Sequence, residues 1–332
     1  MEGVKLQFNM YTKIEYLVLN SLSKKLKYFL SFFLFLMLLM IGEIVSPGYF
    51  SLSHIIHLLT LAAPLGILTI GQTFVILSGK EDVDFSTGAC ASLSIVLTAL
   101  VLQKYSLAIA IGIAALSGLI AGVINGIGVR IMKIPPLLMT FGSAMLLYGV
   151  GQAITRGMSL GTASPFLTFI AVGRIGGIPI AFLIWIGLIV ISAAILHETA
   201  YGRWLYASGS NPKAAGIAGI SNAFVGIAAY AVSGLLSAFA GLLYLGRFTI
   251  PSGFRMAEVY TLPSIMAVIL GGTSFSGGEG GFLGSIGGVL ALTTLDSFFS
   301  IFNISQAWRN VLNGFLLVLI LIFYARKSKI RI

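Results

Sequence analysis

Long apolar stretches recur along almost the whole of this sequence, and they restrict what it can fold into. Charged residues make up 9% of its 332 residues and hydrophobic residues 58%. A soluble protein could not cover its surface with so few charges, whereas a stretch of roughly 18–25 apolar residues can cross a bilayer as a helix. The sequence therefore predicts an all-α, polytopic membrane protein with about ten transmembrane helices, at 28–46, 54–78, 85–103, 107–129, 135–154, 178–197, 222–246, 259–276, 282–301 and 307–325.

The basic residues are divided unequally between the connections on the two sides of these spans. If the N-terminus lies in the cytoplasm, fourteen lysines and arginines lie on the cytoplasmic side and six on the external side. This bias predicts that both termini are cytoplasmic and that the protein lies in a bacterial cytoplasmic (inner) membrane. We divide the chain into a cytoplasmic segment (1–27), a membrane domain (28–325) with a cytoplasmic connection at 198–221, and a basic cytoplasmic tail (326–332).

The ionisable residues do not form the pattern of an enzyme or of a nucleic-acid-binding protein. The net charge of +10 comes from basic residues scattered between the spans, where they orient helices, so no nucleic-acid partner is predicted. The single cysteine, Cys90, excludes an intrachain disulfide, and His54 and His57 have no nearby carboxylate with which to bind a metal. No catalytic residue, metal or cofactor is predicted, and a phosphate-binding G-x-x-x-x-G-K-[ST] loop is absent from the sequence.

Some spans contain residues that interrupt helices. Pro64, Gly66 and Gly71 are expected to break the second span, and the glycine-rich run at 271–281 is expected to separate the eighth from the ninth. Irregular backbone near membrane depth is tolerated only where protein or a water-filled cavity satisfies its polar groups. The sequence thus predicts broken helices around a central pathway.

Small residues recur every four positions in the fourth span, at Gly118, Gly122 and Gly126. Such a face lets a neighbouring helix approach closely in lipid. We therefore expect it to be a helix-packing face rather than a binding site.

Polar side chains inside apolar spans are costly in lipid, so they usually face protein or water. For each of them, hydrogen bonding between helices is the alternative to a place along a solute path. Aromatic side chains can stack on the apolar face of a sugar, although in a bundle most of them only pack. The candidate pathway residues are Gln72, Asp84, Asn125, Phe141, Gln152, Gly272, Thr273 and Asp296.

The most charged stretch beside a span runs from Lys80 to Asp84. One interpretation is a solvated cytoplasmic turn, in which Asp84 or Ser86 caps the third span. The other places Asp84 at a conformational switch or against a partner protein. The residues alone leave both interpretations open.

The connection at 198–221 is amphiphilic and rich in glycine and alanine. Asn211 can cap a short helix, Pro212 fits its first turn and Gly219 can end it. A helix of this length, near 211–218, is too short to stand alone. We therefore expect this short helix to protrude as a knob and to dock into a groove of a partner protein.

Five elements, in order along about residues 60–325, resemble bacterial ABC importer permeases of the ribose and simple-sugar type. Asp84, Ser86 and Gly88 fit that family's Gly-Gly-Ile-Asp-Leu-Ser-x-Gly pattern, although Glu81 and Asp82 replace its glycines. The other matching stretches are 125–142, 202–220, 266–280 and 307–314. The resemblance implies a type II ABC importer fold and a permease subunit, not an enzyme, that translocates a sugar or sugar-like solute.

The resemblance also implies three protein partners in the bilayer-embedded importer. These are a separate ATPase subunit, an extracytoplasmic solute-binding protein, and a second permease copy or a paralogue. The ATPase would act on the connection at 198–221. The residues implied in this coupling are Gly202, Arg203, Gly209, Asn211, Ala214, Ala215 and Gly219.

Three other functions are weighed against this one. A branched-chain amino acid ABC permease resembles the same pattern more distantly. An ion-coupled secondary transporter would need coupling carboxylates in the bundle and no docking knob. An intramembrane enzyme would need a paired nucleophile and base, or metal ligands, at membrane depth, and the sequence offers neither.

Overall fold

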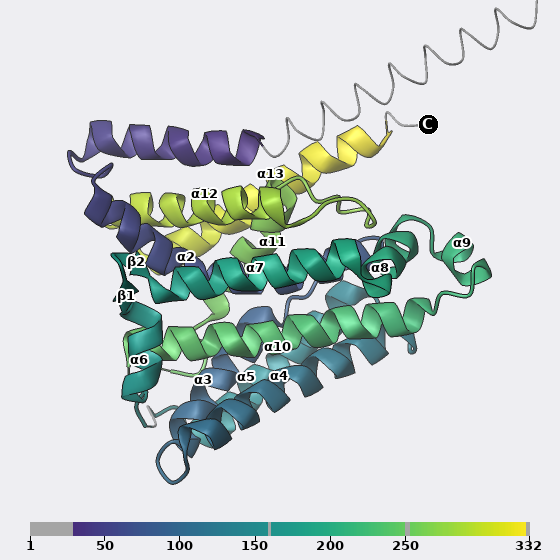
Figure 1. Ribbon diagram of the computed structural model, residues 1–332, viewed down its shortest axis with the longest axis horizontal. Coiled ribbons are helices and arrows are strands. Elements are labelled where there is room, and N and C mark those ends of the chain that lie inside the picture. The colour runs from purple at the N-terminus through teal and green to yellow at the C-terminus, as the bar shows by residue number, and fades with distance from the viewer. Residues whose placement is uncertain (1–28, 159–160, 250–252, 330–332) are drawn as a thin grey trace, which may run out of the picture.

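The protein is represented by a computed structural model that describes residues 29–158, 161–249 and 253–329. The predicted segment 1–27 and the last residues of the predicted tail, 330–332, lie outside the described residues. Long helices lie side by side across the view and form one bundle, and the all-α prediction is confirmed (Figure 1). The elements are the helix Phe29–Val45, α2 (Leu52–Ser78), α3 (Thr87–Val101), α4 (Leu107–Arg130), α5 (Pro136–Thr155), α6 (Pro165–Val172), β1 (Arg174–Ile175), β2 (Ile178–Pro179), α7 (Ile180–Glu198), α8 (Ala200–Ser210), α9 (Pro212–Ile217), α10 (Asn222–Phe248), the 3-10 helix η1 (Glu258–Tyr260), α11 (Thr261–Leu270), α12 (Phe282–Ile301) and α13 (Gln306–Lys329).

Each of the ten predicted spans overlaps a helix of the described chain, but the eighth, 259–276, is helical only as far as Leu270. By length and composition, six helices are able to cross a membrane: α2, α4, α5, α7, α10 and α12. Three further apolar helices are shorter, namely Phe29–Val45, α3 and Glu258–Leu270. α3 is short because the chain before it has already turned back into the bundle as non-helical backbone.

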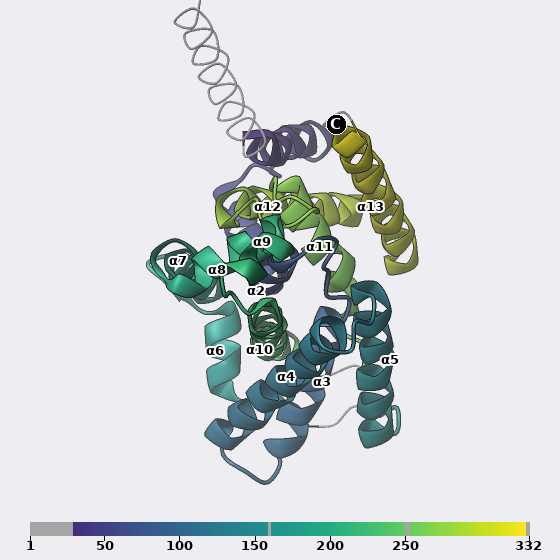
Figure 2. The ribbon, with the colours of Figure 1, turned by 90° about the vertical axis from the view of Figure 1, so that its right-hand side faces the viewer.

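Helix α2 occupies the centre of the bundle. Its residues 62–78 are all buried, and it packs against α7, α10, α11 and α12. Viewed from the α8–α9 end, α2 lies between α12 on one side and α10 on the other (Figure 2). The middle of a single chain is therefore filled by a helix, and the predicted pathway does not run through this position.

The prediction that α2 is broken is wrong, because Leu52–Ser78 is one continuous helix. Proline is tolerated within membrane helices where neighbouring groups satisfy the freed backbone. The two glycines mark close packing instead of a break. A Cβ at Gly66 would meet the Trp185 ring, and one at Gly71 would meet the backbone of Ser233.

The glycine ladder of α4 packs against α10 as expected. A Cβ at Gly118 would meet the Gly234 carbonyl oxygen, and one at Gly122 would meet the Tyr230 carbonyl oxygen. Gly234 in turn has no room for a Cβ beside Gly118. The two backbones are in direct contact, which gives the small-residue face its stabilising role.

Two predicted connections contain more structure than expected. Between α5 and α7, the Ser164 side chain accepts a hydrogen bond from the Leu167 amide, Pro165 starts α6, and a two-residue hairpin follows. α6 packs on the end of α10, where a Cβ at Gly246 would meet the Leu167 carbonyl. The connection at 198–221 likewise contains α8 in addition to the expected short helix.

The loops fall at two opposite ends of the bundle. α8 and α9 lie at one end, together with the glycine-rich run at 271–281 and the C-terminal end of α13 (Figures 1 and 2). The first described helix begins beside the start of α12, because the Ser31 hydroxyl donates to the Gly284 carbonyl at 3.1 Å. Both ends of the described chain therefore lie toward the α8–α9 end, as an even number of spans requires.

Replacing Gly122 with valine should separate α4 from α10. Overpacking of a close helix contact costs about 1–3 kcal/mol, so we expect Gly122→Val to lower the thermal stability of the detergent-purified protein. The matched control is Gly112→Val on the same helix, because Gly112 is exposed and a Cβ there meets none of the described residues within 4 Å. Equal stability of the two variants in a thermal aggregation assay would contradict this account of the α4–α10 contact.

Candidate functional site

The connection between α7 and α10 folds into two short capped helices. The Thr199 hydroxyl accepts a hydrogen bond from the Gly202 amide at the start of α8. Asn211 Oδ1 accepts one from the Ala214 amide at 3.0 Å at the start of α9. Gly219 then adopts a φ of +81°, which glycine reaches without strain. The predicted short helix near 211–218, with its cap and its stop, is thus confirmed.

Helix α8 meets the end of α2 through backbone contacts. A Cβ at Gly209 would meet the Leu77 carbonyl oxygen and the Gly278 amide nitrogen. The Gly278 amide itself donates to the Leu77 carbonyl at 3.1 Å. Three segments far apart in sequence, 77–81, 206–210 and 275–281, therefore meet here, and we call this meeting the three-segment junction.

Further hydrogen bonds tie the three-segment junction together. The Tyr206 hydroxyl donates to the Gly280 carbonyl at 2.8 Å, and the Ser210 hydroxyl donates to the Gly278 carbonyl at 3.2 Å. On the other side, the Glu81 amide donates to the Phe275 carbonyl at 3.0 Å. Helix α8 is thus connected, through the glycine-rich run, to the residues that follow α2.

The outer face of α9 is exposed beyond the bundle. The Ile217 side chain is 90% exposed, and Lys213 and Gly216 are exposed beside it. The coupling candidates divide between this surface and the interior. Arg203, Asn211, Ala214 and Gly219 are exposed, whereas Gly202, Gly209 and Ala215 are buried.

Between α2 and α3 the chain turns back into the bundle as non-helical backbone, and we call residues 79–86 the re-entrant segment. The Gln72 side chain forms two hydrogen bonds with the backbone of Asp84. Its Nε2 donates to the Asp84 carbonyl at 2.5 Å, and its Oε1 accepts from the Asp84 amide at 3.2 Å. Gln72 precedes the end of α2 by six residues. Asp84 therefore lies about 9 Å inside that end of the helix.

The Asp84 carboxylate is fully buried and accepts hydrogen bonds from uncharged groups. Oδ1 accepts from the Ser86 amide at 2.9 Å and from the Ser86 hydroxyl at 2.6 Å, and Oδ2 accepts from the Ser233 hydroxyl at 2.8 Å. The Asn125 side chain adds a donor to the Ser86 hydroxyl at 2.8 Å. Side chains from α2, α4 and α10 thus converge on one short loop.

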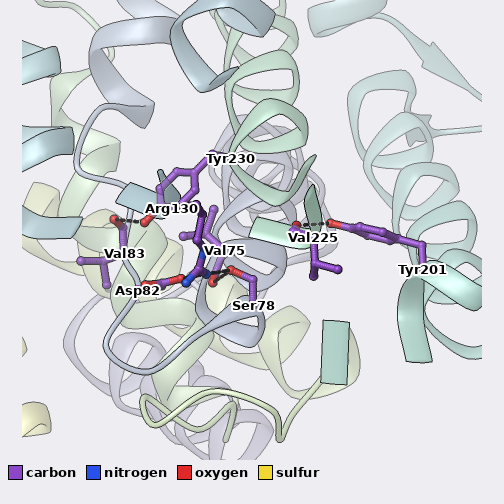
Figure 3. A network of polar contacts seen from close by, with 8 residues as sticks. All are labelled: Val75, Ser78, Asp82, Val83, Arg130, Tyr201, Val225 and Tyr230. Atoms are coloured by element: carbon purple, nitrogen blue, oxygen red, sulfur yellow. Dashed lines mark hydrogen bonds and ion pairs between the residues drawn. The ribbon is translucent and has the colours of Figure 1, made fainter. Parts of the chain in front are cut away.

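Two more side chains hold the backbone of the re-entrant segment. The Phe85 amide donates to the Thr140 hydroxyl at 3.0 Å, which brings in α5. The Tyr230 hydroxyl of α10 donates to the Val83 carbonyl at 3.4 Å (Figure 3). Buried backbone groups without partners are costly, so these side chains replace the hydrogen bonds that a helix would have made.

An ion pair closes the outer end of the re-entrant segment. The Asp82 carboxylate pairs with the Arg130 guanidinium, and the Ser78 hydroxyl is hydrogen-bonded to both (Figure 3). The side chain of Asp82 is 3% exposed and that of Arg130 is 18% exposed. The ion pair and the Ser78 hydrogen bonds therefore hold the C-terminal end of α4 against the C-terminal end of α2.

The interpretation of this stretch as a solvated cytoplasmic turn is wrong for all but its first residues. Lys80 and Glu81 are exposed, whereas Asp82 and Asp84 are buried. Ser86 precedes α3 without forming a side-chain cap, because its hydroxyl donates to Asp84 instead. The charged residues alone do not distinguish the two interpretations, because the burial of these carboxylates depends on Arg130 and Ser233, which are distant in the sequence.

Residues 54–321 match a family model described as branched-chain amino acid transport system / permease component. The chain belongs to this family. No solved structure matches it.

Several relatives of the permease align over most of both chains. The ribose import permease protein RbsC of Bacillus subtilis (strain 168) is 32% identical over 313 residues, 93% of this chain and 95% of the relative. The autoinducer 2 import system permease protein LsrC of Escherichia coli O157:H7 is 29% identical, with coverages of 88% and 84%. The galactose/methyl galactoside import permease protein MglC of Salmonella typhimurium is 27% identical, with coverages of 88% and 94%.

The structure distributes the pathway candidates of the permease among three environments. Gln72, Asp84 and Asn125 come together, fully buried, around the re-entrant segment. Thr273 is buried within the glycine-rich run, where its hydroxyl faces Gly281, and Gly272 beside it adopts a φ of +86°. The exposed candidates are Phe141 and Gln152 on α5, and Asp296, which pairs with Arg309 near the far end of α12.

Sequence reasoning missed several residues that hold these two sites. Ser233 and Arg130 bind the carboxylates of the re-entrant segment, and Tyr206 binds the glycine-rich run. A buried carboxylate needs hydrogen-bond donors, so the position of Arg130 at the end of a neighbouring span could have indicated it as a partner of Asp82. Ser233 and Tyr206 gave no such signal, because serines and tyrosines are frequent in this chain and their partners are decided by helix packing.

Removing the arginine of the buried ion pair should destabilise the permease strongly. Arg130→Met leaves the Asp82 carboxylate buried without a charge partner, which typically costs about 3–5 kcal/mol. We expect a clearly lower aggregation temperature in detergent. Adding Asp82→Asn to Arg130→Met should recover most of the loss, because the unpaired charge is then gone. Wild-type stability of Arg130→Met alone would show that the pair does not hold the two helices together.

Proposed function

We propose that this permease forms the membrane path of an ATP-driven importer for a sugar or sugar-like solute. The observation that carries the proposal is similarity over nearly the whole chain to permeases whose names assign them ribose, galactose/methyl galactoside and autoinducer 2 import. The aligned region contains both the re-entrant segment and the three-segment junction. A branched-chain amino acid, which the family description names, is the alternative solute.

A separate ATPase subunit supplies the energy and docks on the outer face of α9. This proposal is supported by the exposure of Ile217, an apolar side chain at the end of α9, with the exposed Lys213 on the same short helix. Exposed apolar side chains at such a position suit the groove of a partner protein. The α8–α9 end, and with it both chain termini, is then cytoplasmic, and a solute-binding protein delivers the solute at the opposite end.

The solute path lies between two permease copies, or between this chain and a paralogue. Because α2 fills the centre of one chain, a path must use an outer surface. Helix α5 offers one: Phe141 and Gln152 are exposed on it, and a Cβ at Gly142 or Gly149 meets none of the described residues within 4 Å. An aromatic ring and a side-chain amide, without a fixed charge, suit an uncharged polyhydroxylated solute.

The decisive experiment is uptake by the reconstituted importer. Proteoliposomes that contain the permease, its ATPase and its solute-binding protein should accumulate one radiolabelled sugar from a panel of pentoses and hexoses only when ATP is supplied to the ATPase. Leucine serves as the control solute, and its uptake would favour the amino acid alternative. Uptake driven by a proton or sodium gradient without ATP would overturn the proposal in favour of a secondary transporter.

Docking and sidedness can be tested in membrane vesicles. The purified ATPase should sediment with inside-out vesicles that contain the permease but not with right-side-out vesicles. Ile217→Glu should weaken this binding at least about tenfold, because it places a charge in an apolar contact. Tyr105→Ser, an exposed change at the other end of the bundle, is the control. Equal binding by both vesicle types would show that the orientation or the docking surface is wrong.

A further inference from the structure

We infer that the three-segment junction is the element that transmits movement of α8 to the re-entrant segment, and that the Tyr206 hydroxyl positions the glycine-rich run for this purpose. The inference rests on the proposed function, because the movement is that of a coupling segment driven by an ATPase. It assigns a role to residues 275–281 of the glycine-rich run.

The first argument is the kind of contact that the junction makes. Gly209, Leu77 and Gly278 touch through backbone atoms, and each glycine lacks the room for a Cβ. Long side chains between two elements can change rotamer and absorb a displacement, but backbone atoms in van der Waals contact cannot. A shift of α8 must therefore displace the glycine-rich run or the end of α2.

The second argument is the conformation of the glycine-rich run. Gly277, Gly278 and Gly280 have φ values of +79°, +64° and +140°. A Cβ at Gly277 or Gly278 would meet a neighbouring segment, and one at Gly280 would meet Thr273 of the same run. The run is a tight turn that is wedged between α8 and the residues after α2. Its shape is defined by these neighbours, so it follows them when they move.

The third argument is the continuity of hydrogen bonds through the junction. Tyr206 on α8 donates to the Gly280 carbonyl at 2.8 Å, and the carbonyl of Phe275, in the same run, accepts from the Glu81 amide at 3.0 Å. Glu81 has a φ of +60° and directly precedes the buried part of the re-entrant segment. A displacement of α8 thus reaches the loop that contains Asp84 through two hydrogen bonds and one turn.

The re-entrant segment lies at the end of this chain of contacts, so a movement of α8 would change the contacts that it makes. Its polar groups are bound by side chains of α2, α4, α5 and α10 at once. Moving the re-entrant segment would therefore change contacts on four helices, including α5, whose outer face we assign to the solute path. The three-segment junction is therefore sufficient to transmit a movement of α8 to the re-entrant segment.

The test is Tyr206→Phe, which removes the hydroxyl and keeps the ring. In the reconstituted importer we expect the variant to hydrolyse ATP near the wild-type rate. We expect it to transport about fivefold less solute per ATP hydrolysed, because the loss of one net hydrogen bond changes an equilibrium constant by about that factor. The matched control is Tyr201→Phe on the same helix. Its hydroxyl donates to the Val225 carbonyl of α10 at 3.2 Å, outside the junction, and its loss should leave the ratio unchanged.

A purely structural role for Tyr206 would change the ratio no more than Tyr201→Phe does. Size-exclusion profiles and co-purification with the ATPase establish that both variants fold and assemble. An unchanged ratio in Tyr206→Phe, or an equal fall in both variants, would overturn the inference. Failure of the wild-type importer to use ATP at all would instead overturn the proposed function, so the two outcomes are distinguishable.

Discussion

The structure depends on the satisfaction of polar backbone where the chain is not helical inside the bundle. In lipid, an unpaired amide or carbonyl is costly, so a loop can re-enter at membrane depth only if side chains pair with it. Gln72, Thr140 and Tyr230 meet that requirement for the loop between α2 and α3, and Asn125 binds the Ser86 hydroxyl of the same loop. Because these residues belong to different helices, the same hydrogen bonds fix how the helices are placed around the loop.

Close backbone packing is the second organising feature, and it serves two purposes. In the middle of the bundle, the glycines of α4 and α10 allow two helices to touch without intervening side chains, which stabilises their association where apolar burial gives little advantage. At the α8–α9 end, Gly209 and Gly278 make a similar contact between loops and helix ends. A contact between backbone atoms resists deformation, so it suits a place where a movement of one element has to be transmitted to the next.

A single copy of the permease has its most polar and its most exposed features in different places. Asp82, Asp84, Gln72 and Asn125 are buried around the re-entrant segment, and the outward faces of α4, α5 and α7 carry mostly apolar side chains. Those faces must be covered by lipid or by another permease chain. The buried polar residues of the predicted spans, Gln72, Asp84 and Asn125, bind groups of the protein itself.

The sequence by itself determined the all-α, polytopic class of fold, the order of the apolar helices, the helix break between α11 and α12, and the capped helix α9. Each rests on local signals, namely apolar length, glycine runs, and the Asn211, Pro212 and Gly219 pattern. Tertiary structure alone decided that Pro64 lies in a continuous central helix, that Asp84 is buried, and that Gly209 packs against Leu77. The physical reason is that burial, and the partner of a buried polar or small residue, depend on which segments meet in space, and neighbours in the sequence do not specify that.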